Sequence, residues 1–313
     1  MVYRLEDINR RVLEDPERFV QECDTAYEKN VLRAAEAIVA NIERSRIVLL
    51  SGPSGSGKTT TAKNIELALK KFGIVTHTIS LDNYYKDVDP EKTPRNADGI
   101  YDFESPELLD TELLVQQFLD LDQGKEISIP KFEFKNQKRN PDRAVPLHLN
   151  DNEIAIFEGI HALNDRLTAH GEGRLAEKIY ISARSNIEKD GKVVFKGTWK
   201  RIIRRAIRDR QYRGASAQET FMMWDNVRRG EKKYISPFKH TADIMFNTAL
   251  PYEVPALKRF AKDLFDDIAP ETPRYNEIRQ LEKALELFED LDEKYIPRTS
   301  LLREFIGGGI HSY

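Results

Sequence analysis

The stretch Gly52-Pro53-Ser54-Gly55-Ser56-Gly57-Lys58-Thr59 decides the fold of this chain. It fits the pattern G-x-x-x-x-G-K-[ST], in which a glycine-rich loop wraps around phosphate groups. The apolar run 46–50 precedes it and predicts a buried strand. After it, Ala62, Ile65 and Leu69 repeat at helical spacing. A strand, a glycine loop and a helix in this order are the context that the motif requires.

The residue types of this loop favour an anionic ligand that is accompanied by a metal ion. Glycines allow the backbone to approach phosphate oxygens, and the N–H groups at the start of the helix attract negative charge. Lys58 can reach the β- and γ-phosphates, and the Thr59 hydroxyl can hold Mg²⁺. The alternative is a glycine-rich turn that precedes a helix by coincidence. The lysine, the hydroxyl and the flanking elements together disfavour it.

Composition narrows the class of protein. The chain has 313 residues, of which 40% are hydrophobic and 32% charged, which is typical of a globular protein with a charged surface. Its net charge of −3 provides no general attraction to nucleic acid or to an anionic membrane. Cys23 is the sole cysteine, which excludes an intrachain disulfide and favours a reducing compartment. With no apolar run near ~18 residues and a charged N-terminus, we expect a cytoplasmic protein without a membrane partner.

Apolar runs and helical patterns alternate along the chain. Strands are predicted at 46–50, 74–80, 154–157, 178–182 and 244–247, and helices at 105–119, 198–212, 253–267 and 274–292. This order predicts an α/β protein of the P-loop NTPase fold, with a central parallel sheet, helices on both faces and a helical lid. We expect a helical N-terminal extension (1–45), a P-loop kinase domain (46–270), and a C-terminal helix with a glycine-loosened tail (271–313).

Two carboxylates follow predicted strands. Asp82 ends the strand 74–80, and ligands gather at the carboxyl ends of strands in such sheets. There a carboxylate can accept a hydroxyl proton or help to hold the metal, although an Asx turn is an alternative. Glu158 ends the strand 154–157, where a Mg²⁺-binding carboxylate is expected; an ordinary strand-end carboxylate is the alternative. His161 is more typical of a cap or a packing residue.

The segment 199–213 contains seven cationic side chains. A solvated basic face, a nucleic-acid patch and an arginine-bearing lid are three interpretations of it. No series of aromatic residues interleaves the arginines and the net charge is negative, so the lid is favoured and nucleic acid is not. Arg228 and Arg229 form a further candidate anion site, with a helix-end charge pair as the alternative.

Over roughly residues 46–250 the chain resembles the uridine kinase/phosphoribulokinase family. The resemblance is carried by the phosphate loop, Ser80–Tyr85, Tyr101–Phe103, Ile129–Phe134, Glu158–His161 and the arginine helix, in this order. It is similar above all to bacterial uridine kinase-like P-loop proteins, including the ending at residues 300–308. The domain resembling the N-terminal part of threonyl-tRNA synthetase, which often precedes their kinase domain, is absent from this sequence.

The resemblance implies ATP and Mg²⁺ as cofactors and assigns a role to individual residues. Asp82 becomes the general base, Thr59 and Glu158 hold the metal, and Lys58, Arg205 and Arg208 act on the transferred phosphate. The residues expected to bind ATP are Gly52, Ser54, Gly55, Ser56, Gly57, Lys58, Thr59, Thr60 and Arg213. The residues expected to contact the acceptor are Asp82, Tyr85, Asp102, Phe132, Gln137, Arg139, Arg228 and Arg229.

The departures from the family concern the acceptor. Phe132 and Gln137 replace a tyrosine and a histidine that read the uracil edge, and Ala215 replaces a lid arginine. A site without those polar groups discriminates less, although the Gln137 amide still offers a donor and an acceptor.

We therefore expect γ-phosphoryl transfer to a small hydroxyl acceptor. A uridine- or cytidine-like nucleoside is the first candidate. A sugar or sugar phosphate, gripped by Arg228 and Arg229, is the second. An ATP-binding regulator associated with RNA, with slow ATPase activity, is the alternative from another class. A homo-oligomer remains an open option.

Overall fold

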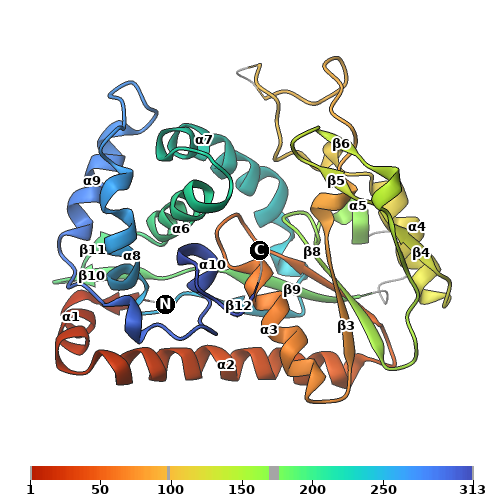
Figure 1. Cartoon of the computed structure of the whole chain (residues 1–313), viewed down its shortest axis with the longest axis horizontal. Helices are drawn as coiled ribbons and strands as arrows, with labels where there is room; N and C mark the ends of the chain where they lie inside the picture. The colour runs from red at the N-terminus through yellow and green to blue at the C-terminus, as the bar shows by residue number, and fades with distance from the viewer. Residues whose placement is uncertain (1, 97–98, 169–175, 312–313) are drawn as a thin grey trace.

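A five-stranded parallel sheet lies at the centre of the computed structural model, which describes residues 2–96, 99–168 and 176–311 (Figure 1). Its strand order is β12-β9-β2-β8-β3. The strands are β2 (Ile47–Ser51), β3 (Val75–Ser80), β8 (Glu153–Glu158), β9 (Glu177–Ser182) and β12 (Ile244–Asn247). Each coincides with a predicted strand, which confirms the predicted α/β class.

Helices cover both faces of the sheet, because successive strand residues point to opposite sides. Val48 and Leu50 of β2 join one hydrophobic cluster, whereas Ile47 and Leu49 join the other. The larger cluster includes residues of α1 (Leu5–Glu14), α2 (Pro16–Asn41), α3 (Lys58–Lys70), α6 (Gly197–Tyr212), α7 (Ala217–Gly230), α8 (Glu253–Ala261), α9 (Tyr275–Leu285) and α10 (Arg303–Ile306). The smaller one includes residues of α4 (Thr111–Asp122) and α5 (Asp165–Thr168).

Several short elements were not predicted, because two to four residues produce no periodic signal. β1 (Val2–Arg4), β10 (Asn186–Lys189) and β11 (Lys192–Phe195) form a second sheet, so residues 2–4 are a strand rather than the predicted helix. Two small antiparallel pairs are β4 (Ile127–Ile129) with β7 (Val145–Leu147), and β5 (Phe132–Glu133) with β6 (Lys138–Arg139).

Helix boundaries differ where capping residues intervene. The predicted helix 105–119 is a 3₁₀ turn, Pro106–Leu108, capped by Ser105, and then α4, capped by Asp110. α9 ends at Leu285, seven residues before the predicted end at residue 292. On the opposite face of the sheet from α4, α6 and α7 stand side by side (Figure 1).

The C-terminal segment does not have the loose character that its glycines suggested. Leu301, Leu302 and Phe305 are completely buried, and α10 packs against α6 (Figure 1). Gly307 donates its N–H to the Arg303 carbonyl, and a Cβ at Gly309 would lie 2.9 Å from the Arg303 side chain. Residues 301–309 are therefore part of the packed structure.

Asp24 of α2 connects the N-terminal helices to the C-terminal segment. Tyr252 donates its hydroxyl to Asp24 Oδ1 at 2.6 Å, and the same hydroxyl lies 2.7 Å from Ser300 Oγ. Asp24 Oδ2 is buried with no hydrogen-bond partner among the described residues. Burial raises the pKa of Asp24 to about 6, because the charged form is poorly solvated there.

We predict that Asp24→Asn stabilises the protein at alkaline pH. The pKa of Asp24 is higher in the folded state than in the unfolded state, so ionisation of Asp24 lowers the free energy of unfolding. This destabilisation grows as the pH rises from about 4 to about 6 and is constant at higher pH. Unfolding in denaturant at pH 8 should show the variant more stable by about 1–3 kcal/mol, and this difference should shrink as the pH falls below 6 and disappear below about pH 4. The control is Glu36→Gln, an exposed carboxylate on the same helix. A variant that is less stable than the wild type at pH 8 would contradict this.

Candidate active site

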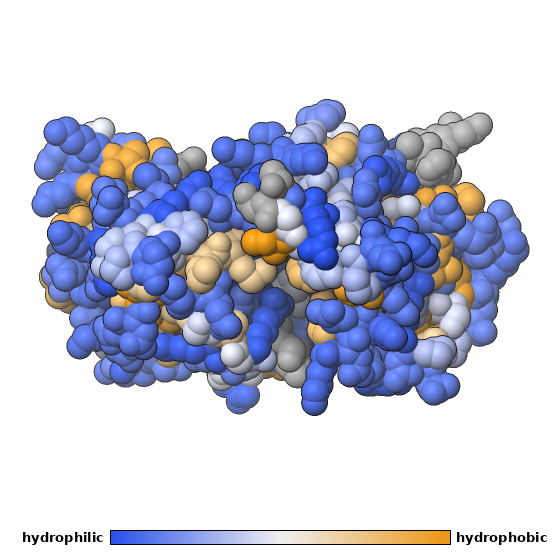
Figure 2. All heavy atoms as spheres, turned by 90° about the horizontal axis from the view of Figure 1, so that it is seen from above, coloured by the Kyte–Doolittle hydropathy of each residue, from blue (hydrophilic) through white to orange (hydrophobic). Residues whose placement is uncertain are grey.

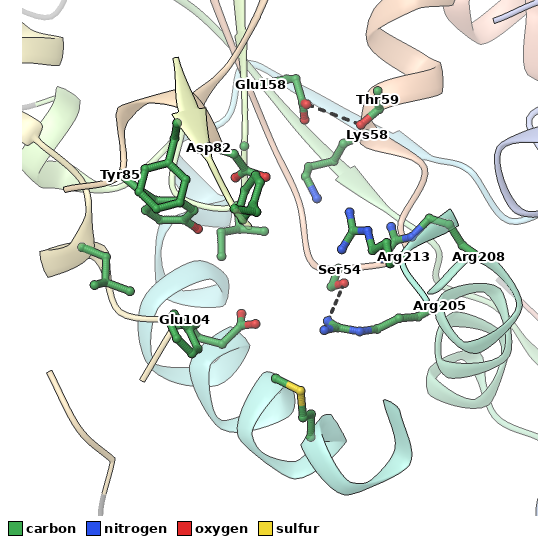
Figure 3. A pocket seen from close by; sticks show the side chains of 18 of the residues that line it. Ser54, Lys58, Thr59, Asp82, Tyr85, Glu104, Glu158, Arg205, Arg208 and Arg213 are labelled. Atoms are coloured by element: carbon green, nitrogen blue, oxygen red, sulfur yellow. Dashed lines mark hydrogen bonds between the residues drawn. The ribbon is translucent and has the colours of Figure 1, made fainter. Parts of the chain in front are cut away.

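A cavity of about 400 Å³ opens at the carboxyl ends of β2, β3 and β8. Figure 3 shows Lys58 and Thr59 with the arginines Arg205, Arg208 and Arg213 on one side of it. Asp82, Tyr85 and Glu104 lie on the other side. We call these the donor side and the acceptor side.

The phosphate loop is packed so closely that glycine is required at Gly52 and at Gly57. A Cβ at Gly52 would lie 2.3 Å from the Ile181 carbonyl oxygen. Gly57 has a φ of +82°, and a Cβ there would lie 2.8 Å from the Leu301 side chain. The loop therefore has little freedom, and α3 begins directly after it at Lys58.

Lys58 points from the start of α3 into the cavity (Figure 3). Its Nζ donates to the Pro53 carbonyl at 3.3 Å. Burial lowers the pKa of Lys58, and the neighbouring Glu158 and Asp82 carboxylates oppose that shift. The ammonium is thus held beside two carboxylates at the mouth of the phosphate loop.

Thr59 and Glu158 form the candidate metal site. Thr59 Oγ1 lies 3.4 Å from Glu158 Oε1 (Figure 3). Burial raises the pKa of Glu158 to about 7, an effect that Lys58 counteracts. The described residues contain no cluster of three His, Cys, Asp or Glu side chains suited to a metal. A hydroxyl and one carboxylate fit Mg²⁺, which takes its remaining ligands from water and phosphate oxygens.

Asp82 lies on the first turn after β3, where Ser80 accepts its N–H. Burial raises the pKa of Asp82, whereas Lys58, Arg213 and Arg208 lower it. Its carboxylate faces the cavity from the acceptor side, across from Lys58 (Figure 3).

Four of the five arginines of α6 divide into two groups. Arg205 and Arg208 line the cavity together with Arg213, which follows the helix. Arg205 donates to Ser54 Oγ at 2.9 Å, and Asp209 accepts hydrogen bonds from both Arg205 and Arg208. These three fit the predicted anion-binding role.

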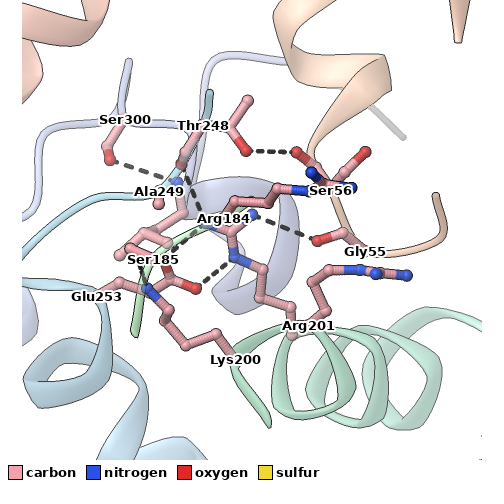
Figure 4. Close-up of polar contacts among 12 residues, drawn as sticks. Gly55, Ser56, Arg184, Ser185, Lys200, Arg201, Thr248, Ala249, Glu253 and Ser300 are labelled. Atoms are coloured by element: carbon pink, nitrogen blue, oxygen red, sulfur yellow. Dashed lines mark hydrogen bonds and ion pairs between the residues drawn. The ribbon is translucent and has the colours of Figure 1, made fainter. Parts of the chain in front are cut away.

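Arg201 and Arg204 instead brace the phosphate loop from behind. Arg201 donates to the Ser54 carbonyl at 2.9 Å, and Arg204 donates to the Gly55 carbonyl at 3.3 Å. Arg204 also forms a two-pronged ion pair with Glu253, at 2.5 and 2.7 Å, in which both side chains are fully buried. Thr248 Oγ1 donates to the Ser56 carbonyl at 2.6 Å (Figure 4). Three consecutive loop carbonyls are therefore tied down by side chains from distant segments.

Aromatic rings form the wall of the acceptor side. Tyr85, Phe132 and Phe134 contact one another edge to face, with centroid separations of 5.3–6.3 Å. Gln137 lines the same space with a φ of +52°, at the turn between β5 and β6. This wall suits a flat or apolar part of an acceptor.

Glu104 is a cavity residue that the sequence interpretation missed. Its Oε2 is buried without a hydrogen-bond partner in the described part of the chain, and burial raises the pKa of Glu104 to about 7. The predicted residue was Asp102, two positions earlier, which accepts the Tyr234 hydroxyl at 3.3 Å instead. The available signal was the position of Glu104 directly after the motif 101–103.

Other expected site residues lie outside the cavity lining. Gly52, Ser56 and Thr60 are part of the buried loop structure. Arg139 donates to the carbonyls of Tyr84 and Tyr85 and to Asp110, which holds the turn after Asp82 in place. Arg228 pairs with Glu231, and Arg229 donates to Asn226 at 3.5 Å. The structure thus gives these arginines bracing contacts rather than a place on the cavity surface.

Among the described residues, no helix is long and apolar enough to cross a bilayer. On the face seen from above, apolar residues form small groups separated by hydrophilic ones (Figure 2).

Comparison with known proteins places residues 47–254 within the model of the phosphoribulokinase/uridine kinase family. The chain is 40% identical over 120 residues to a uridine kinase of Schizosaccharomyces pombe, covering 38% of this chain but only 25% of that protein. It is 28% identical to a uridine kinase of Brevibacillus brevis, covering 64% of this chain and 83% of that protein. A possible uridine kinase from Bacillus stearothermophilus aligns structurally with a TM-score of 0.42 and 17% identity, covering 64% and 88% of the two chains.

We predict that Arg204→Met lowers stability by about 3–5 kcal/mol, because it leaves the Glu253 carboxylate buried without its partner. Denaturant unfolding measures the loss. The matched control is Arg210→Met, on an exposed position of the same helix, which should change stability by less than about 0.5 kcal/mol. Equal effects of the two substitutions would show that the buried pair is not needed.

Proposed function

This chain belongs to the phosphoribulokinase/uridine kinase family, and from that premise we propose that it transfers the γ-phosphoryl group of ATP to a hydroxyl of a small molecule. The observation that carries the proposal is the position of Asp82. This carboxylate stands between the phosphate loop with its arginines and an aromatic acceptor wall, within one cavity.

On the donor side, the residues favour binding and charge neutralisation. The loop N–H groups and the start of α3 attract phosphate oxygens, and Lys58 faces the phosphates that carry most negative charge. Arg205, Arg208 and Arg213 line the same donor side of the cavity as Lys58. Guanidinium groups suit this task because they bind phosphate oxygens in a two-pronged manner. Bound Mg²⁺, held by Thr59 and Glu158, would neutralise charge on the β- and γ-phosphates.

On the acceptor side, Asp82 is the proposed general base. A hydroxyl placed beside Asp82 can give up its proton as it attacks phosphorus. Burial raises the pKa of Asp82, which makes its carboxylate a stronger base. The positive charges of Lys58, Arg208 and Arg213 keep the carboxylate available in its ionised form.

A nucleoside of the uridine or cytidine type is the proposed acceptor. The rings of Tyr85, Phe132 and Phe134 can contact a flat base, and the Gln137 amide can pair with its edge. Glu104, whose Oε2 is buried without a partner among the described residues, can accept a hydrogen bond from a sugar hydroxyl. A sugar-phosphate acceptor has less support, because the arginines expected to grip its phosphate lie outside the cavity lining.

The test is a screen of nucleosides, sugars and sugar phosphates for ADP release that depends on the added compound. Stimulation by a nucleoside supports the proposal, whereas stimulation by a sugar phosphate alone favours the second candidate. ADP release that no acceptor stimulates, together with salt-sensitive RNA binding, would overturn the kinase assignment in favour of a regulator.

We predict that Lys58→Ala lowers the rate of acceptor-dependent ADP release at least ~10²-fold, because it removes charge stabilisation at the migrating phosphoryl group. Steady-state kinetics with saturating ATP give the comparison. Lys70→Ala, at the far end of α3, is the control and should retain wild-type turnover. Turnover close to wild type in Lys58→Ala would exclude the proposed mechanism.

Asp82→Asn is expected to reduce the same rate ~10²–10⁴-fold, since the amide cannot accept the hydroxyl proton. ATP affinity, measured by calorimetry, should change only a few fold because the loop is untouched. A variant that keeps its turnover would show that Asp82 is not the base.

A further inference from the structure

The C-terminal segment places a carboxylate on the phosphate loop. Glu304 Oε2 accepts the backbone N–H of Thr60 at 3.3 Å and also accepts the Thr60 hydroxyl. Thr60 is the third residue of α3 and is completely buried. Glu304 itself is also buried and at the same time lines the cavity.

These two donors belong to the positions at which nucleotide phosphates bind in such a loop. The first N–H groups of a helix have no partner within it and carry its positive end. α3 has no acidic residue in its own first turn, so Glu304 supplies an anion there from a segment 244 residues away. The carboxylate thus uses hydrogen bonds that a phosphate would otherwise accept.

The position of this contact along the loop indicates which phosphate is affected. In such a loop the lysine, here Lys58, reaches toward the β- and γ-phosphates, and backbone N–H groups cradle the α- and β-phosphates. Thr60 lies two residues beyond Lys58 on α3. The group that competes with Glu304 is therefore the α-phosphate.

The backbone of the segment is firmly anchored. Leu301, Leu302 and Phe305 are completely buried, and the Arg204 guanidinium lies 5.1 Å above the Phe305 ring. Arg303 donates to the carbonyl of Pro297. Displacing this segment would expose all of these apolar groups, whereas Glu304 needs only a side-chain rotation to leave Thr60.

We propose that Glu304 sets the nucleotide affinity of this enzyme by competing with the α-phosphate for the N–H and hydroxyl of Thr60. Nucleotide binding requires the Glu304 carboxylate to turn away while α10 stays docked. The proposal rests on the proposed binding of ATP, and it concerns ligands that carry an α-phosphate on a nucleoside. Inorganic pyrophosphate can occupy the two positions nearer Lys58 and avoid the competition.

The test compares ADP with inorganic pyrophosphate in calorimetry on the full chain. Glu304→Gln removes the charge but keeps an oxygen that can accept from Thr60. We expect it to bind ADP at least about tenfold more tightly, because a neutral amide oxygen accepts from Thr60 more weakly than a carboxylate and is displaced more easily by the phosphate. The affinity of Glu304→Gln for pyrophosphate should exceed that of the wild type by less than about threefold. Glu286→Gln, an exposed carboxylate near the end of α9, is the matched control and should bind both ligands as the wild type does.

Each other outcome decides against a defined part of the account. Unchanged or weaker ADP binding by Glu304→Gln would overturn the competition and leave the kinase assignment standing. An equal gain in affinity for ADP and for pyrophosphate would mean that Glu304 repels any anion in the cavity. That result would overturn the assignment of the competing group as the α-phosphate. Failure of the wild type and the variant alike to bind ADP would overturn the proposed function together with this inference.

Thermal unfolding establishes that the variant is folded. If Glu304→Gln does not fold, Glu304→Asp provides the same test, because its shorter side chain withdraws the carboxylate from Thr60. It should then bind ADP more tightly than the wild type, and wild-type affinity would overturn the proposal.

Discussion

The orientation of the phosphate loop is fixed by hydrogen bonds that its carbonyl groups accept from side chains of distant segments. Arg201, Arg204 and Thr248 bind the carbonyls of Ser54, Gly55 and Ser56 in succession. Arg204 can be buried there only because Glu253 neutralises it at 2.5 Å. In a peptide unit the C=O and N–H point in opposite directions, so fixing the carbonyls of Ser54 and Ser56 also fixes the N–H groups of Gly55 and Gly57, whereas Ser56 donates its own N–H to the Pro53 carbonyl at 3.2 Å. The surface that we propose to bind phosphate is thus shaped by contacts on the far side of the loop.

The helical repeat of α6 places its arginines on two faces, which have different contacts. Arg201 and Arg204 are three residues apart and share the face toward the loop and the core, whereas Arg205 and Arg208 share the neighbouring face toward the cavity. Part of a single basic helix therefore fixes the loop, and another part faces the cavity, where we propose that it acts on the phosphate. A movement of this helix would change both at once, which couples the lid arginines to the geometry of the donor side.

The fold was predictable because its signals are local. The five core strands are short runs rich in apolar or β-branched residues, and the loop that follows β2 has a fixed spacing of glycines and lysine. The bracing contacts were not predictable, since Glu253 and Glu304 lie 49 and 244 residues from their partners. Arg139 illustrates the same limit: its charge suggested a ligand, but its guanidinium is used by the carbonyls of Tyr84 and Tyr85. On the acceptor side, the sequence motif suggested Asp102, whereas the residue that lines the cavity is Glu104, two positions later.

The central claim is that donor and acceptor meet in one cavity, so that the phosphoryl group passes directly between them. A single-turnover reaction with ATP labelled in its γ-phosphate, in the presence of the acceptor that the screen identifies, tests this most directly. The account predicts that the label appears in a phosphate ester of the acceptor at the rate at which ATP disappears. Label found only in inorganic phosphate, at a rate that the acceptor does not change, would contradict it.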